Sequence, residues 1–171
     1  MRVIVAAVGR AKAGRDGAAP EAVLFENYAR RASFDVTLAE VEERRQLPPA
    51  QRMAREGELL EWAEIVGHSS GTPAGPVEDA MAAGRDVLLE IDVQGAGWVR
   101  RRRPDAVLIF LAPPSLEELE RRLRSRGTEG EEALARRLAR ARDELAERGR
   151  FDHVVVNDDL DRAVAEVEAI L

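Results

Sequence analysis

Short apolar runs alternate along this chain with longer stretches in which apolar residues recur every three or four positions. The runs are three to six residues long and contain few polar positions. Runs of this kind predict strands of a parallel sheet that is covered on both faces. Their alternation with helical stretches predicts an α/β fold, a mainly parallel sheet flanked by helices. We expect strands at residues 3–8, 36–41, 86–91, 106–111 and 154–156.

Capping and turn residues set the expected helices. Ser115 stands before apolar residues at helical spacing, and Glu118 follows three residues later, which predicts a capping box. The stretch 67–76 is rich in glycine and serine and is predicted to be a loop. Besides the helix that Ser115 begins, we expect helices at residues 20–31, 47–60, 76–84, 131–148 and 160–171.

The composition narrows the class of protein. A length of 171 residues with 45% hydrophobic residues suits one ordinary domain with a real core. The net charge of −6 does not favour nucleic-acid binding. The chain has no cysteine, which excludes disulfides and thiolate metal sites and fits a reducing compartment. With no signal-peptide pattern and no apolar run near the ~20 residues of a membrane span, we expect a soluble cytoplasmic protein that binds no membrane.

Three blocks carry the most specific signal, namely 60–64 (Leu-Glu-Trp-Ala-Glu), 88–95 (Leu-Leu-Glu-Ile-Asp-Val-Gln-Gly) and 154–159 (Val-Val-Val-Asn-Asp-Asp). In this order they resemble the guanylate kinase family, and the resemblance extends over residues 61–171. It implies a P-loop-kinase-like fold that binds GMP and ATP and, if it is active, transfers a phosphoryl group with Mg²⁺.

The resemblance also assigns substrate-binding residues. Glu61 would accept hydrogen bonds from guanine, which offers adjacent N–H donors where adenine does not. Thr72 would contribute a hydroxyl to the same base. Ser70 stands where the family has a tyrosine that holds the GMP phosphate, so we expect one phosphate contact to be lost. Asp92 follows a predicted strand at the carboxyl end, where ligands bind in open α/β sheets, and would lie beside the nucleotides.

Catalytic and cofactor residues follow from the same resemblance. Arg122, Arg126 and Arg137 match the family's lid arginines, and positioned cations are what phosphoryl transfer requires. Asn157 matches the residue that packs near the adenine of ATP. The alternative for each arginine is an ordinary solvated position on a highly charged helix. No metal site made of protein side chains is predicted.

The phosphate-binding loop departs from the family. After the first strand the chain reads Gly9-Arg-Ala-Lys-Ala-Gly14, so the glycine spacing of the motif is present. Arg15 then replaces the lysine that reaches the phosphates, and Asp16 replaces the hydroxyl that binds Mg²⁺. A carboxylate at that position would repel phosphate. We therefore expect phosphoryl transfer to be weak or absent.

The first sixty residues resemble a different family, the large-subunit ribosomal RNA pseudouridine methyltransferases. The residues that carry this resemblance are 1–10, 25–31, 40–45 and 55–60. Members of that family use S-adenosylmethionine, but their cofactor pocket comes from a C-terminal half that has no counterpart here, so use of this cofactor is not expected. The sequence thus predicts a composite of a methyltransferase-like segment, 1–60, and a guanylate-kinase-like region, 61–171.

Three functions remain open from the sequence. The first is GMP binding with weak or absent ATP-dependent phosphorylation, which leaves open whether the protein is an enzyme. The second is a non-enzymatic interaction module of the same fold that binds a protein partner. The third is a remnant of an RNA methyltransferase. The lost phosphate contact and the altered loop favour the second over a fully active kinase.

Overall fold

The computed structural model of the chain describes residues 3–8, 41–43, 58–65, 68–125 and 130–171. The chain divides into two compact units. The first unit contains Met1–Ala7 and Ala32–Leu108, and the second contains Val8–Arg31 and Ile109–Leu171.

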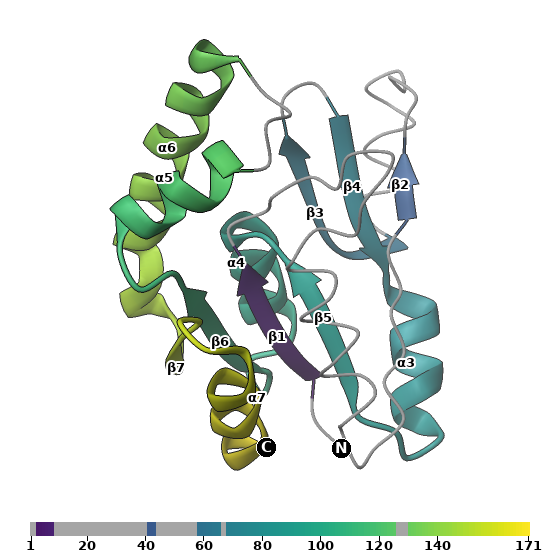
Figure 1. Ribbon diagram of the computed structural model, residues 1–171. Coiled ribbons are helices and arrows are strands. Elements are labelled where there is room, and N and C mark those ends of the chain that lie inside the picture. The colour runs from purple at the N-terminus through teal and green to yellow at the C-terminus, as the bar shows by residue number, and fades with distance from the viewer. Residues whose placement is uncertain (1–2, 9–40, 44–57, 66–67, 126–129) are drawn as a thin grey trace. The chain divides into compact units, whose positions relative to one another are not determined.

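A pair of parallel strands forms the centre of the first unit (Figure 1). Strand β1 (Val3–Val8) runs beside β5 (Val87–Ile91), with Val3 opposite Val87 and Ala7 opposite Ile91. Most side chains of β5 are buried, as its apolar run predicts. Helix α4 (Val93–Arg102) begins two residues after β5 and contacts both β5 and β3. The N-terminal strand β1 therefore belongs to the parallel sheet.

The first unit also contains a small antiparallel sheet. Its order is β2 (Val41–Glu43), β4 (His68–Pro73) and β3 (Leu59–Ile65), as Figure 1 shows. Helix α3 (Ala74–Ala82) follows β4 directly. Two residues beyond this helix lies Gly84, whose φ of 82° is in the left-handed region that glycine adopts without strain.

Two predictions in this unit are wrong. Residues 67–76 were expected to form a loop, but 68–73 form β4 and α3 begins at Ala74. Position 71 of this strand is a glycine because a Cβ there would lie only 2.7 Å from the carbonyl oxygen of Glu61. The helix predicted to reach residue 60 is also wrong at its end, where Leu59 and Leu60 begin β3. The backbone of Glu61 and the close strand pairing explain the glycine without a turn.

The second unit is built on another pair of parallel strands. Strand β6 (Val107–Ala112) pairs with β7 (His153–Val156), and Ile109 lies opposite His153. Of β6, the residues from Ile109 onward belong to this unit. Helix α7 (Leu160–Ile170) follows β7 and buries Ala163, Val164 and Val167.

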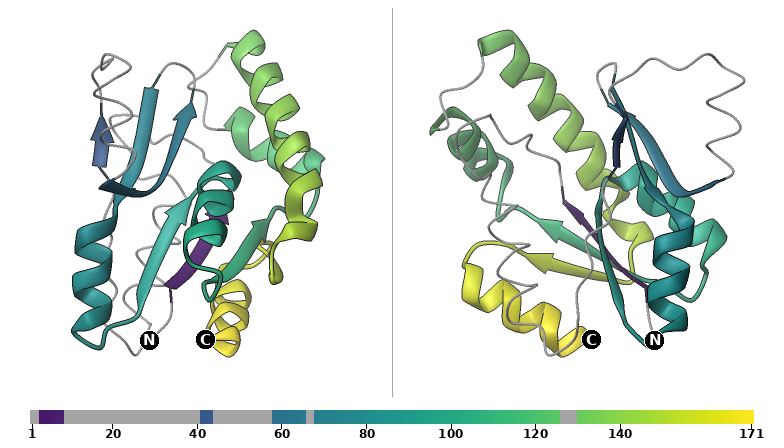
Figure 2. Two further views of the ribbon diagram at one scale, coloured as in Figure 1. Left: turned by 180° about the vertical axis from the view of Figure 1, so that it is seen from behind. Right: turned by 90° about the vertical axis from the view of Figure 1, so that its right-hand side faces the viewer.

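Helices α5 (Leu116–Ser125) and α6 (Glu131–Ala146) of this unit lie against one another, and the short 3₁₀ helix η1 (Glu147–Arg150) extends α6 (Figure 2). Arg124 near the end of α5 donates to both carboxylate oxygens of Glu131, the first residue of α6. This contact joins the two helices across residues 126–129, which lie outside the described residues.

The predicted α/β architecture with parallel strands flanked by helices is confirmed. Strands β1, β5, β6 and β7 agree at each end to within one residue with four predicted strands, those at 3–8, 86–91, 106–111 and 154–156. The helices predicted at 76–84, 131–148 and 160–171 correspond to α3, α6 with η1, and α7. Of the strand predicted at 36–41 only Val41 is described, and it begins β2. The helix predicted at 20–31 lies outside the described residues.

Candidate functional site

The first unit brings a buried carboxylate and a buried hydroxyl together. Glu61 of β3 and Thr72 of β4 lie opposite one another in the strand pairing, and their side chains are 5% and 3% exposed. The hydroxyl of Thr72 donates to Oε1 of Glu61 at 2.7 Å. A short bond from a hydroxyl to a carboxylate is of the charge-assisted kind, which stabilises and orients a buried carboxylate. The pairing of β3 with β4 thus fixes the direction of the Glu61 side chain.

Helix α4 meets this pair through its first turn. Asp92 is the N-cap residue, 4% exposed, and its Oδ1 accepts a hydrogen bond from the backbone N–H of Gly95 at 2.8 Å. A Cβ on Gly95 would lie 2.6 Å from Oε2 of Glu61, so the carboxylate of Glu61 lies directly against this turn. We call Glu61, Thr72, Asp92 and Gly95 the carboxylate cluster. It combines residues of β3, β4 and α4 and the carboxyl end of β5.

Two tryptophans also connect β3 to α4. The ring centroids of Trp62 and Trp98 are 6.5 Å apart with the planes tilted by 36°. The guanidinium of Arg101 lies 4.3 Å from the centre of the Trp98 ring, within the range of a cation–π interaction. Trp62 is the neighbour of Glu61 in the chain, so this contact helps to hold the carboxylate cluster in place.

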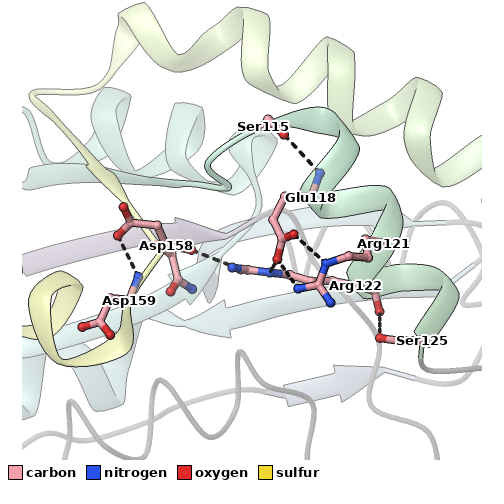
Figure 3. A network of polar contacts seen from close by, with 8 residues as sticks. Ser115, Glu118, Arg121, Arg122, Ser125, Asp158 and Asp159 are labelled. Atoms are coloured by element: carbon pink, nitrogen blue, oxygen red, sulfur yellow. Dashed lines mark hydrogen bonds and ion pairs between the residues drawn. The ribbon is translucent and has the colours of Figure 1, made fainter.

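The second unit contains a separate polar network, which Figure 3 shows at the start of α5. The Glu118 carboxylate accepts from Nε of Arg122 at 2.8 Å and, through both oxygens, from Arg121 at 2.7 Å. Arg122 also donates through Nη1 to the backbone carbonyl of Asn157 at 3.1 Å. We call Glu118, Arg121, Arg122 and Asn157 the arginine cluster. It fixes a cation at the carboxyl end of β7.

Within this network the two arginines shift the pKa of the Glu118 carboxyl group. Hydrogen bonds from Arg121 and then from Arg122 lower the pKa of Glu118 to about 2. Ser115 accepts from the backbone N–H of Glu118 at 3.1 Å, which confirms its predicted role as the helix cap. The predicted capping box is wrong in its second half, because the carboxylate of Glu118 turns to the two arginines instead.

The predicted site residues fall into both units. Glu61, Thr72 and Asp92 meet in the carboxylate cluster of the first unit, and Arg122 and Asn157 meet in the arginine cluster of the second. Arg137 lies on α6 and is partly exposed. Ser70 lies on β4 opposite Ala63, and its side chain is outside the described part of the structure, as is the whole of Arg126.

Sequence reasoning gave no functional role to three residues of these clusters, Gly95, Glu118 and Arg121. Gly95 was part of a matching block but had no assigned function. Glu118 was expected to cap the backbone. Its spacing of four residues from Arg122 is that of an ion pair on one helix face and could have indicated the contact.

The ion pairs of the arginine cluster can be tested by a pH titration of Glu118, with the Glu118→Gln variant to identify the signals. Because its folded-state pKa is lowered to about 2, the ion pairs of Glu118 stabilise the protein above its usual pKa of about 4.3. That stabilisation is lost as the pH falls from there through the folded value. We expect the carboxyl carbon of Glu118 to titrate in NMR near pH 2, and the Arg122 Nε resonance to move with it.

The spectrum of Glu118→Gln identifies both signals, since the first should disappear and the second should shift already at pH 7. A titration midpoint of Glu118 near pH 4.3 would show that the two arginines do not hold this carboxylate in solution.

The described residues contain no group of three or more His, Asp or Glu side chains that could hold a metal ion. None of the helices in these ranges is long and apolar enough to cross a membrane.

The chain is similar to known proteins both in its family and in its sequence. The family model described as guanylate kinase matches residues 48–171. The guanylate kinase of Parasynechococcus marenigrum strain WH8102 is 57% identical over 119 residues, which are 70% of this chain and 65% of that protein. That of Synechococcus sp. strain CC9902 is 60% identical over 112 residues, 66% of this chain and 60% of that protein. The match thus spans less than two thirds of these relatives.

Comparison of structures supports the fold. The crystal structure of guanylate kinase from Anaplasma phagocytophilum aligns with a TM-score of 0.69 over 99% of this chain and 82% of that one, at 23% identity. Residues 1–47 lie outside the family match, and these findings give no support to the predicted methyltransferase resemblance of residues 1–60. That resemblance and the division near residue 60 stay predictions. The glycine-rich stretch 9–16 lies outside the described residues.

Proposed function

The chain belongs to the guanylate kinase family, and we propose that it binds GMP through the carboxylate cluster. The observation that carries this proposal is the pair of Glu61 and Thr72, buried and joined at 2.7 Å. A carboxylate is an acceptor at both oxygens, so it suits the adjacent N1–H and 2-amino donors of guanine. Adenine presents an acceptor and no 2-amino group on that edge, so the same carboxylate would discriminate against it.

The rest of the cluster supports a nucleotide beside the base-reading residue. Asp92 lies at the carboxyl end of β5, the end of a parallel strand at which α/β proteins bind ligands. Its carboxylate caps α4 and is therefore held in one orientation. Ser70 replaces the family's tyrosine, and we propose that one contact to the GMP phosphate is missing for that reason.

The reaction proposed for the chain is ATP plus GMP giving ADP plus GDP. A phosphate oxygen of GMP attacks the γ-phosphorus of ATP, and the bond from that phosphorus to the bridging oxygen of ADP breaks. Arg122, Arg126 and Arg137 would spread charge from the transferred group. Arg122 is suited to this because Glu118 and the Asn157 carbonyl already orient it. Asn157 would pack near the adenine of ATP.

Mg²⁺ is part of this reaction, and it supplies charge neutralisation on the phosphates when it is bound with ATP. An oxygen donor of the kind that Mg²⁺ prefers is present in Asp92, one of whose carboxylate oxygens accepts from Gly95. This fits a residue near the metal. The substrates and the absence of cysteine fit a cytoplasmic protein.

The rate of phosphoryl transfer is proposed to be low. Arg15 and Asp16 stand where the phosphate loop needs a lysine and a hydroxyl. The same departures favour a second candidate, a non-enzymatic module that keeps the guanine site and binds a protein partner. The methyltransferase reading rests on residues 1–60 alone, and no role of S-adenosylmethionine is proposed.

Calorimetric titration of the purified protein with GMP tests the proposal, with AMP as the control ligand. We expect GMP to bind in the micromolar range and AMP at least tenfold more weakly, because only guanine satisfies Glu61. A coupled assay of GDP formation from ATP then separates the two candidates, and little turnover above background is expected. Equal affinity for the two nucleotides, or no heat with either, would contradict guanine recognition by this cluster.

A further inference from the structure

We propose that Gly95 is a positioning residue for guanine specificity, because its missing side chain makes the space that the carboxylate of Glu61 occupies. The inference rests on the proposed function, in which Glu61 reads the base. It adds a residue that would not touch the nucleotide. Gly95 would act only through the direction in which it lets Glu61 point.

The contact distances support this role. A Cβ built on Gly95 would lie 2.6 Å from Oε2 and 3.2 Å from Cδ of Glu61, and 3.2 Å from Cβ of Ile91. Carbon and oxygen atoms that are not bonded pack at about 3.5 Å or more. The carboxylate of Glu61 and any side chain at position 95 therefore compete for the same space.

The backbone gives no other reason for a glycine at this position. Gly95 lies inside α4, where glycine is a poor helix former. Among the described glycines, the one with a positive φ is Gly84. Gly95 therefore has a helical conformation that alanine would adopt more readily. The close approach of Glu61, and to a lesser degree that of Cβ of Ile91, requires its small size.

The carboxylate is also held by a hydrogen bond. Thr72 donates to Oε1 of Glu61, which leaves Oε2 directed at the first turn of α4. The backbone N–H of Gly95 is bonded to Asp92, so this turn is itself fixed. The most mobile atom in the contact is the end of the Glu61 side chain. A methyl group at position 95 is therefore expected to displace the carboxylate rather than the helix.

Gly97 offers a matched control two residues further along the same helix. A Cβ on Gly97 would meet only Nη1 of Arg101, at 3.8 Å, which is ordinary van der Waals contact. Gly95→Ala and Gly97→Ala gain the same helix propensity. The two variants therefore differ in whether the new methyl group meets Glu61 and, at a longer distance, Cβ of Ile91.

Titration of both variants with GMP and AMP is the decisive experiment. We expect Gly95→Ala to bind GMP at least tenfold more weakly than the wild type, with the ratio of GMP to AMP affinity falling by a similar factor. Gly97→Ala should keep both affinities within twofold. A role in folding alone would lower the affinity for both nucleotides together. GMP affinity and selectivity of Gly95→Ala equal to those of Gly97→Ala would overturn the proposal.

Urea unfolding without nucleotide separates this inference from the proposed function. Gly95→Ala should unfold at a lower urea concentration than Gly97→Ala, and most of the difference should disappear when Glu61 is also replaced by alanine. If the wild type does not select GMP, the proposed function fails, and the unfolding comparison still decides whether Gly95 positions Glu61. A midpoint for Gly95→Ala equal to or above that of Gly97→Ala would overturn that placement.

Discussion

Replacing Glu61 by glutamine is expected to weaken GMP binding about a hundredfold, which corresponds to about 2–3 kcal/mol for lost hydrogen bonds to a charged group. Glutamine has the same size, and its carbonyl oxygen can still accept from the hydroxyl of Thr72, as Oε1 of Glu61 does at 2.7 Å. Its amide nitrogen, however, is a donor. In the proposed complex it would face a donor of guanine, and neither group would be satisfied.

The measurement is a calorimetric titration of Glu61→Gln with GMP and AMP. Affinity for AMP should stay within twofold of the wild type, because adenine offers Glu61 no matching pair of donors. Glu117→Gln is a suitable control, since it makes the same change at an exposed position on α5. A GMP affinity of Glu61→Gln within twofold of the wild type would exclude this carboxylate as the group that reads the base.

The parts of the fold that the sequence predicted correctly are those in which burial alone decides the structure. Strands β5 and β6 are apolar at nearly every position, and both are buried along most of their length. The pattern therefore gave their ends to within one residue. Helix α7 was predicted equally well, because Ala163, Val164 and Val167 follow its helical spacing and are buried.

The strand β4 was missed because its glycine has a cause outside the local sequence. Glycine and serine in 67–76 are typical of loops, yet Gly71 is small because the carbonyl of Glu61, ten residues earlier, lies where its Cβ would be. A pattern within a few residues contains no information about a partner strand. The same limit explains why the beginning of β3 was predicted to be helical.

In the candidate site, too, the sequence indicated some features and not others. Glu61, Thr72 and Asp92 were predicted from the resemblance to the family, which assigns each of them by position, and their roles stay predictions. The bond from Thr72 to Glu61 joins two strands, and the contact between Gly95 and Glu61 joins a helix to a strand. Both depend on how these elements pack, which no spacing in the sequence contains. Gly95 therefore had no predicted role.

Replacing Ile109 by alanine is expected to lower the free energy of unfolding by about 2–5 kcal/mol. Its side chain is fully buried in β6, and the unit to which it belongs has a small core that includes Val155 and Val164. Alanine removes three methyl or methylene groups, and close-packed neighbours fill such a space only in part. The cost should therefore exceed that of the transfer to water alone.

Urea unfolding followed by circular dichroism measures this loss, with Val154→Ala on the neighbouring strand β7 as the control. The side chain of Val154 is 42% exposed, so its removal should change the free energy by less than about 1 kcal/mol. Equal losses in the two variants would contradict a packed core around Ile109.

The two replacements with the largest expected effects, Ile109→Ala and Glu61→Gln, separate an effect on stability from an effect on GMP recognition. Ile109→Ala should lower the urea concentration at the unfolding midpoint. Glu61→Gln keeps the size of the side chain and its Thr72 partner, so it should leave that midpoint nearly unchanged and weaken GMP binding.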